Sequence, residues 1–256
     1  MLKHRVIPAL LLSEGGLVKT RKFKNARYVG DPINAIRIFN EKEVDELMVL
    51  DISASKARRE PDYALIELFA GECFMPLCYG GGIKNMDQAE KIFQLGIEKI
   101  SMQSGVMANF RLVSDVAKKF GSQSVVVSID FKYDWLGKSQ LYDSSVEKII
   151  KKSWKDFVKE AVDSGAGELL INVVDKDGTK QGYDLKIIEE VSSMVSIPVI
   201  ALGGAGNMSD FKKAVGVGAA AVSAGAMFVF HGPHDAVLIT YPSYIELENL
   251  LGGNHG

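Results

Sequence analysis

The chain has 256 residues, of which 47% are apolar, and its formal net charge is −2. This length suits one (β/α) barrel or two small domains and allows a large buried core. The nearly balanced charge excludes a general electrostatic attraction to nucleic acid or to a membrane surface. No apolar run reaches the roughly 18 residues of a membrane span, so we expect neither a nucleic-acid nor a membrane partner.

The first residues, MLKHRVIPALLL, lack the small-residue cleavage site of a signal peptide and predict a strand. The two cysteines, Cys73 and Cys78, do not form a disulfide framework. Together these features predict a cytoplasmic protein.

Short apolar segments alternate with amphipathic helical patterns along the whole chain. Strands are expected at 5–12, 46–51, 76–79, 99–102, 124–130, 168–173, 198–202 and 220–223. Helices fill the gaps, for example at 87–95, 153–163 and 184–194. Eight strands that each precede a helix predict a (β/α)8 TIM barrel, with residues 1–256 as one domain. An open doubly wound sheet is the alternative.

An internal repeat divides this barrel in two. YGGGIK (79–84) resembles LGGAGN (202–207), ISMQSG (100–105) resembles VSAGAM (222–227), and RVIPALL (5–11) resembles VVVSID (125–130). All three offsets are close to half the chain, which indicates two related half-barrels.

Two glycine-rich turns follow buried strands, in PLCYGGGIKN (76–85) and IPVIALGGAG (197–206). Such turns let backbone N–H groups approach an anion closely. Segments 101–105 and 224–226 lie beside them at the ends of neighbouring strands, so each half contributes one phosphate cup. A ligand with phosphate at both ends fits this pair, and the alternative is two tight turns without a ligand.

Charged residues near the strand ends complete the candidate site. Asp130 ends the fifth strand, where it can act as a general acid or base, or brace its loop. Asp177 and Gly178 can bind a phosphate or form an ordinary turn. The long segment 13–30 carries Lys19 and four further cations, which fits a mobile flap over an anion or a solvated loop. His231 and His234 lack a third ligand, so we expect a surface turn and no metal.

At the opposite end, four strands begin with Arg5, Glu46, Lys99 and Glu168. Two cations and two anions there predict a closed ring of salt bridges. Charges at that end of a barrel ordinarily contribute to stability. A ring that opens would instead control a passage along a hollow barrel axis.

The motifs GDPINA (30–35), LDISAS (50–55), YGGGIKNMDQAEKIFQLGIEKIS (79–101), FGSQSVVVSID (120–130), DKDGTKQGYD (175–184) and IALGGAGNM (200–208) resemble the HisF family, the cyclase subunits of imidazole glycerol phosphate synthase. The resemblance covers nearly the whole chain. It implies a ribulose-phosphate-binding type of barrel, no cofactor, and a HisH-like glutaminase partner on the bottom face. Ammonia would pass through the ring and along the axis to a substrate with two phosphates.

The same resemblance assigns roles residue by residue. The ammonia gate comprises Arg5, Glu46, Lys99 and Glu168. Glu98 matches an acidic position of the glutaminase interface, and Asp130 a catalytic aspartate. Ligand binding falls to Lys19, Gly82, Gln103, Ser104, Asp177, Gly178, Gly204, Gly225 and Ala226.

One departure from the family stands out. Where the family has a second catalytic aspartate, this chain has Leu11, which cannot transfer a proton. Leu11 and the tail HGPHDAVLITYPSY resemble a diverged HisF-like branch found with O-antigen and other surface-sugar amidation systems. That branch implies ammonia delivery to a third enzyme, a sugar amidotransferase. An authentic cyclase of histidine biosynthesis, and a phosphate-sugar barrel unconnected to ammonia, are the alternatives.

Overall fold

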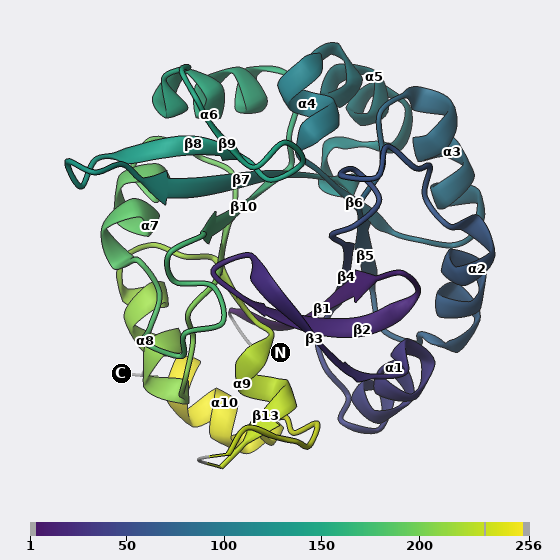
Figure 1. Ribbon diagram of the computed structural model, residues 1–256, viewed down its shortest axis with the longest axis vertical. Coiled ribbons are helices and arrows are strands. Elements are labelled where there is room, and N and C mark those ends of the chain that lie inside the picture. Colours follow the sequence, from purple (N-terminus) through teal and green to yellow (C-terminus); the bar gives the residue numbers. More distant parts are fainter. Residues whose placement is uncertain (1–3, 233, 253–256) are drawn as a thin grey trace.

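The structure is a computed structural model that describes residues 4–232 and 234–252. Within these residues, eight parallel strands surround a common centre and the helices form an outer layer (Figure 1). The barrel strands are β1 (Arg5–Ser13), β4 (Leu47–Asp51), β5 (Leu77–Gly80), β6 (Lys99–Met102), β7 (Val125–Tyr133), β10 (Glu168–Val173), β11 (Val199–Leu202) and β12 (Ala221–Ala224).

Pairing between strands closes the barrel completely. β1 pairs in parallel with both β4 and β12, and β10 pairs in parallel with both β7 and β11. No barrel strand in the described part of the chain is therefore left as an open edge. The predicted (β/α)8 barrel is confirmed, and the open doubly wound sheet is wrong.

The outer layer consists of α1 (Pro32–Glu41), α2 (Tyr63–Glu72), α3 (Met86–Gln94), α4 (Ser104–Ala108), α5 (Arg111–Phe120), α6 (Trp154–Asp163), α7 (Leu185–Ser192), α8 (Met208–Gly216), α9 (Ala226–Val229) and α10 (Tyr244–Leu251). Local sequence sets where they begin. The Asp31 side chain caps α1, with Pro32 at its first position. A capping box of Asn207 and Asp210 begins α8.

Apolar side chains fill two separate regions. The larger core lies between the sheet and the helices, and a smaller cluster of buried side chains lies inside the barrel. This division follows from strand geometry, because successive side chains point to opposite faces of a strand. Among the described residues, no helix is long and apolar enough to cross a membrane.

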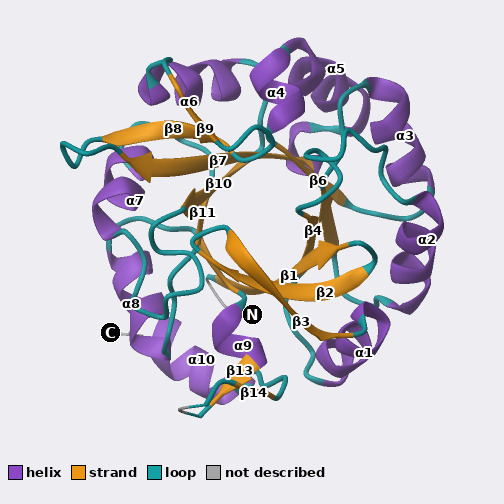
Figure 2. Ribbon diagram, viewed as in Figure 1, coloured by secondary structure: helices purple, strands orange, loops and turns teal. Residues whose placement is uncertain are grey.

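Three hairpins interrupt the alternation of strands and helices (Figure 2). The segment expected as a loop after the first strand forms β2 (Gly16–Arg21) and β3 (Lys24–Gly30), which pair antiparallel. β7 continues into β8 (Ser139–Asp143) and β9 (Lys148–Ile150), and β13 (Phe230–His231) pairs with β14 (Ala236–Val237). Sequence periodicity missed these strands because β3, β9, β13 and β14 are exposed or half-buried, and β2 and β8 are buried over only part of their length.

The hairpins and short helices repeat with the predicted half-barrels. Hairpins β2–β3 and β8–β9 follow the first and fifth barrel strands, and the short helices α4 and α9 follow the fourth and eighth. The two halves therefore place equivalent elements on opposite sides of the barrel, as the internal sequence repeat predicts.

We predict that replacing Gly105 in α4 will destabilise the protein. A Cβ atom at Gly105 would lie 2.4 Å from the Ile83 carbonyl oxygen, so Gly105→Ala should cost about 1–3 kcal/mol of unfolding free energy. The control Gly71→Ala, in an open part of α2, should gain about 0.5–1 kcal/mol. Urea unfolding measures both, and equal effects at the two positions would contradict the close packing of α4.

Candidate active site

A cavity lies where the carboxyl ends of the barrel strands meet, and we call it the mouth cavity. Every residue predicted to bind ligand or carry catalysis lines it: Lys19, Gly82, Gln103, Ser104, Asp130, Asp177, Gly178, Gly204, Gly225 and Ala226. The two predicted phosphate cups therefore belong to one cavity. This position is where (β/α)8 enzymes carry their active sites.

Asp130 lies near the carboxyl end of β7 and is 5% exposed. Its Oδ2 atom accepts a hydrogen bond of 2.6 Å from Gln103 Nε2. Burial raises the pKa of Asp130 to about 7, and the Gln103 hydrogen bond only partly offsets that effect. A carboxyl group with this pKa can both accept and donate a proton near neutral pH.

The Gln103 side chain lies between Asp130 and the β8–β9 hairpin. Its side-chain amide contacts Asp130 and the Tyr142 carbonyl oxygen, and accepts from Ser144 Oγ. The amide is therefore held by protein groups, and the place of Gln103 in a phosphate cup stays a prediction. The orientation of the amide depends on contacts between Gln103, which follows β6, and the β8–β9 hairpin. The sequence motif around Gln103 does not contain these contacts.

Lys19 comes from β2 and is 4% exposed. Its Nζ atom donates to the Ala9 carbonyl oxygen at 2.6 Å. Burial lowers the pKa of Lys19 to about 8, against the opposing attraction of Asp177. A Cβ atom at Gly225 would lie 2.6 Å from Lys19 Nζ, so the glycine leaves room for this ammonium group at the cavity wall.

Asp177 holds the β2–β3 hairpin. Its Oδ2 atom accepts from Thr20 Oγ1 at 2.7 Å and from the Phe23 N–H at 3.2 Å, and its carbonyl oxygen accepts from the Lys22 N–H. Gly178 packs against the same hairpin, because a Cβ there would lie 2.1 Å from the Thr20 carbonyl oxygen. The Asp177 carboxylate is thus committed to the flap, contrary to its expected place in a phosphate cup.

The first cup contains a serine that the sequence analysis did not single out. Ser55 Oγ accepts from the Gly82 N–H at 3.2 Å and from Ser104 Oγ at 3.1 Å. In the second cup, the Gly204 carbonyl oxygen accepts from the Gly182 N–H at 2.8 Å. Gly82 and Gly204 have φ values of +76° and +108°, a region that favours glycine.

Leu11 lines the mouth cavity from β1. Glu14, the nearest acidic residue along the chain, is exposed and lies outside the cavity lining. Asp130 therefore faces the cavity without a second carboxylate from β1.

Sequence reasoning missed Asn172. It lines the cavity from β10, is 8% exposed, and its Oδ1 atom has no hydrogen-bond partner within the described residues. It is the register partner of Asp130 on the neighbouring strand β7, so the two residues lie side by side. A signal was present, because Asn172 is four residues beyond Glu168 and so lies on the same inward face. A buried unpaired amide is a natural contact for a bound ligand.

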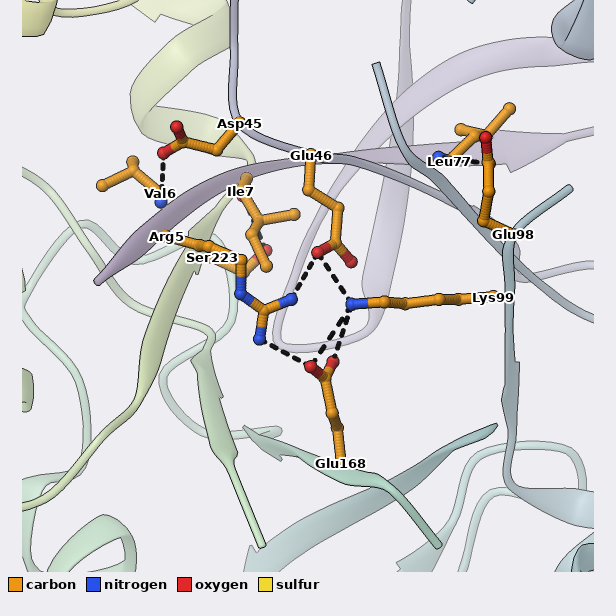
Figure 3. Close-up of polar contacts among 10 residues, drawn as sticks. All are labelled: Arg5, Val6, Ile7, Asp45, Glu46, Leu77, Glu98, Lys99, Glu168 and Ser223. Atoms are coloured by element: carbon orange, nitrogen blue, oxygen red, sulfur yellow. Dashed lines mark hydrogen bonds and ion pairs between the residues drawn. The ribbon is translucent and has the colours of Figure 1, made fainter. Parts of the chain in front are cut away.

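At the other end of the barrel, Arg5, Glu46, Lys99 and Glu168 form a closed arrangement that we call the basal ring (Figure 3). Arg5 donates to Glu46 and, at 2.6 Å, to Glu168. Lys99 Nζ donates to Glu46 at 2.9 Å and to Glu168 at 3.2 Å. Alternation of charge gives each buried carboxylate two cationic partners, which offsets the cost of removing it from water.

Between the basal ring and the mouth cavity lies a set of buried side chains that we call the middle layer. It consists of Ile7, Met48, Cys78, Val126, Leu170, Ile200 and Ala221. On β10 the three tiers follow one another in steps of two residues, as Glu168, Leu170 and Asn172. The expectation of a hollow axis is therefore wrong for this conformation, because side chains fill barrel interiors in layers.

The remaining predicted positions lie at the surface. Glu98 is exposed, and its Oε2 atom accepts from the Leu77 N–H at 2.9 Å (Figure 3). His231 and His234 are exposed near β13, as expected for a surface turn. Across the described residues, no group of three or more His, Cys, Asp or Glu side chains could hold a metal ion.

We predict that Asp130→Asn stabilises the fold in a pH-dependent way. Because burial raises the pKa of Asp130 from 3.8 to about 7, ionisation favours the unfolded chain. The stabilising effect should grow as pH rises from about 4 to about 7 and then level off at no more than ~4 kcal/mol. Urea unfolding across this range measures it. The exposed control Asp87→Asn should show no such trend, and a pH-independent difference for Asp130→Asn would contradict the burial effect.

Comparison with known proteins agrees with this geometry. The model of the histidine biosynthesis protein family matches residues 5–234. The "Putative imidazole glycerol phosphate synthase subunit hisF2" of Pseudomonas aeruginosa is 50% identical over 97% of this chain and 99% of its own length. The "Putative imidazole glycerol phosphate synthase subunit HisF" of Leptospira borgpetersenii is 51% identical over 98% and 99%. The "Imidazole glycerol phosphate synthase subunit HisF" of Streptococcus sanguinis is 40% identical over 90% and 91%. The chain therefore belongs to the HisF family of imidazole glycerol phosphate synthase subunits.

Proposed function

We propose that this protein is the synthase subunit of a glutamine amidotransferase that acts in sugar amidation for surface polysaccharide. It receives ammonia from a HisH-like glutaminase at the basal ring and uses or delivers it at the mouth cavity. The observation that carries this proposal is that the apolar Leu11 lines the mouth cavity from β1 while the basal ring at the other end is complete.

The bottom face supports a role in receiving ammonia. A depression there is lined by Phe93, Ile97, Glu98, Lys99 and Phe120, among others. Lys99 thus joins the basal ring to a surface with apolar and acidic groups, where a glutaminase can dock. In this proposal the ring opens on docking, and ammonia crosses the middle layer as side chains shift transiently. Small members such as Ala221 and Cys78 make that layer easier to cross than one of aromatic rings.

The mouth cavity supports a phosphorylated ligand. Each cup offers polar groups at a glycine-rich turn: Ser55, Ser104 and Gly82 in one, and Gly204, Gly225 and Ala226 in the other. Lys19 lies at the wall beside Gly225 and adds a positive charge below its pKa of about 8. The distribution of these groups on opposite halves of the barrel suits a ligand with an anionic group at each end.

The chemistry of the mouth cavity supports delivery of ammonia over cyclisation. A cyclisation that needs one proton-transferring carboxylate on β1 and one on β7 has only Asp130 at these two positions, because Leu11 can neither accept nor donate a proton. Loss of one member of such a pair usually lowers the rate by orders of magnitude. Delivery to a third enzyme, a sugar amidotransferase, needs the ring and the barrel but not that second carboxylate.

Asp130 favours a second candidate function, the cyclase of histidine biosynthesis. Its pKa of about 7 suits a residue that exchanges protons at neutral pH. In this alternative, Asp130 performs both proton transfers and Leu11 only shapes the cavity.

We predict that Leu11→Asp creates cyclase activity that the unaltered chain lacks or has only weakly. The new carboxylate would face the mouth cavity together with Asp130, so turnover of the histidine-pathway intermediate with ammonium salt should rise by at least about 100-fold. Leu11→Asn is the matched control, since it has similar size but cannot exchange protons. Efficient turnover by the unaltered chain would instead support the authentic cyclase.

We predict that Lys99→Met uncouples nitrogen transfer from the glutaminase. The substitution leaves Glu46 and Glu168 with Arg5 as their remaining partner in the basal ring, which disturbs passage but not the mouth cavity. Product formed from glutamine should fall by about 10-fold or more, whereas product formed from ammonium salt should change little. Calorimetry should still detect glutaminase binding.

The exposed Lys159→Met is the control for this experiment. If the unaltered chain neither binds a HisH-like glutaminase nor stimulates its glutamine hydrolysis, the ammonia proposal fails and a phosphate-sugar barrel without an ammonia role remains. The basal ring would have only a structural role if Lys99→Met lowered stability but left unchanged the ratio of product formed from glutamine to product formed from ammonium salt.

A further inference from the structure

The turn between β8 and β9 reaches the side of Asp130. Strand β8 pairs with β7 so that Tyr142 lies opposite Asp130, and Ser144 follows two residues later. Ser144 Oγ donates a hydrogen bond of 2.5 Å to Gln103 Oε1. On the other side of the same amide, Gln103 Nε2 donates to Asp130 Oδ2 at 2.6 Å. A continuous chain of hydrogen bonds thus leads from the hairpin to the buried carboxyl group.

The groups around Gln103 fix which end of its amide faces Asp130. The amide nitrogen has two N–H donors, and it faces two acceptors, Asp130 Oδ2 and the Tyr142 carbonyl oxygen at 3.3 Å. A reversed amide would place its oxygen against both of these acceptors. The Ser144 hydroxyl holds the opposite end of the amide, so Tyr142 and Ser144 of one hairpin orient Gln103 together.

We infer that the β8–β9 turn is a positioning element for Asp130, and that Ser144 is a positioning residue that acts through Gln103. The value of this positioning for turnover rests on the proposed proton-transfer role of Asp130. The orientation of the Gln103 amide does not depend on that role.

The consequence is electrostatic. A donated hydrogen bond favours the ionised form of a carboxyl group, whereas burial and the neighbouring carboxylates of Asp177 and Asp143 favour the protonated form. Asp177 comes from the β10–α7 loop and Asp143 from β8. Gln103 is the main group that lowers the pKa of Asp130 against these effects, and Ser144 makes a smaller direct contribution in the same direction. The hairpin therefore helps to set the protonation of Asp130 near neutral pH.

The turn is itself fastened to the rim of the mouth cavity. Glu147 forms an ion pair of 2.6 Å with Lys56 of the β4–α2 loop. On the other side, the Tyr142 ring lies 6.2 Å from the ring of Phe23 in the β2–β3 turn. Both contacts restrain the hairpin that carries Ser144, so that this largely exposed turn can orient the half-buried amide of Gln103.

Carbon-13 NMR of aspartate-labelled protein tests the inference without any ligand. Asp130→Asn identifies the Asp130 carboxyl signal, and its pH titration gives the pKa in each variant. Gln103→Leu should raise the pKa of Asp130 by about 1, because the charged hydrogen bond is lost. Ser144→Ala should raise it by a smaller amount. Ser145→Ala is the matched control, since Ser145 Oγ donates to Asp143 and not to Gln103.

A double variant decides whether Ser144 acts through Gln103. If it does, Ser144→Ala should change the pKa of Asp130 by no more than its smaller direct contribution when Gln103 is already leucine. A full effect of Ser144→Ala in that background, or equal pKa values in Ser144→Ala and Ser145→Ala, would overturn the inference.

The pH dependence of nitrogen transfer separates this inference from the proposed function. If Ser144→Ala moves both the NMR titration and the pH–rate profile to higher pH, the positioning role and the proton-transfer role are both supported. If the titration moves and the profile does not, the positioning stands and the proposed role of Asp130 fails.

Discussion

The register in which the parallel strands close the barrel determines every functional feature of this protein. Side chains two residues apart on one strand point to the same face of the sheet. Successive inward-facing residues of a strand can therefore belong in turn to the basal ring, the middle layer and the mouth cavity. On β10 these are Glu168, Leu170 and Asn172, each held by pairing with β7 and β11. A shift of one residue would turn all three outward.

The two ends of the barrel handle buried charge in opposite ways. The basal ring combines two carboxylates with two cations, so each ionised group has partners of opposite charge. In the mouth cavity, the neutral amide of Gln103 donates a hydrogen bond to Asp130, and no cation in the described part of the chain is paired with its carboxyl group. Burial, together with nearby carboxylates, therefore raises the pKa of Asp130 to about 7. Paired charges therefore lie at one end of the barrel, and a buried carboxyl group with a raised pKa lies at the other.

Hairpins complete the site that the barrel begins. The β2–β3 hairpin carries Lys19 into the cavity wall and is held by Asp177, and the β8–β9 hairpin orients Gln103. Both contain residues that would otherwise be exposed, and both gain order from contacts with the barrel rim. Loops on a rigid scaffold commonly carry function in this way. Here the equivalent placement of the two hairpins follows the half-barrel repeat.

The sequence by itself determined the barrel, its eight strands, the composition of the basal ring and the location of Asp130, because periodicity and strand order are local signals. Only the tertiary structure decided that Gln103 contacts Asp130, that Asp177 holds a hairpin, that Asn172 is unpaired, and that side chains fill the barrel axis. The hydrogen bonds among these features join residues 27 to 157 positions apart in the sequence. Hydrogen-bond partners and packing across such separations depend on three-dimensional distances, which no spacing along the chain encodes.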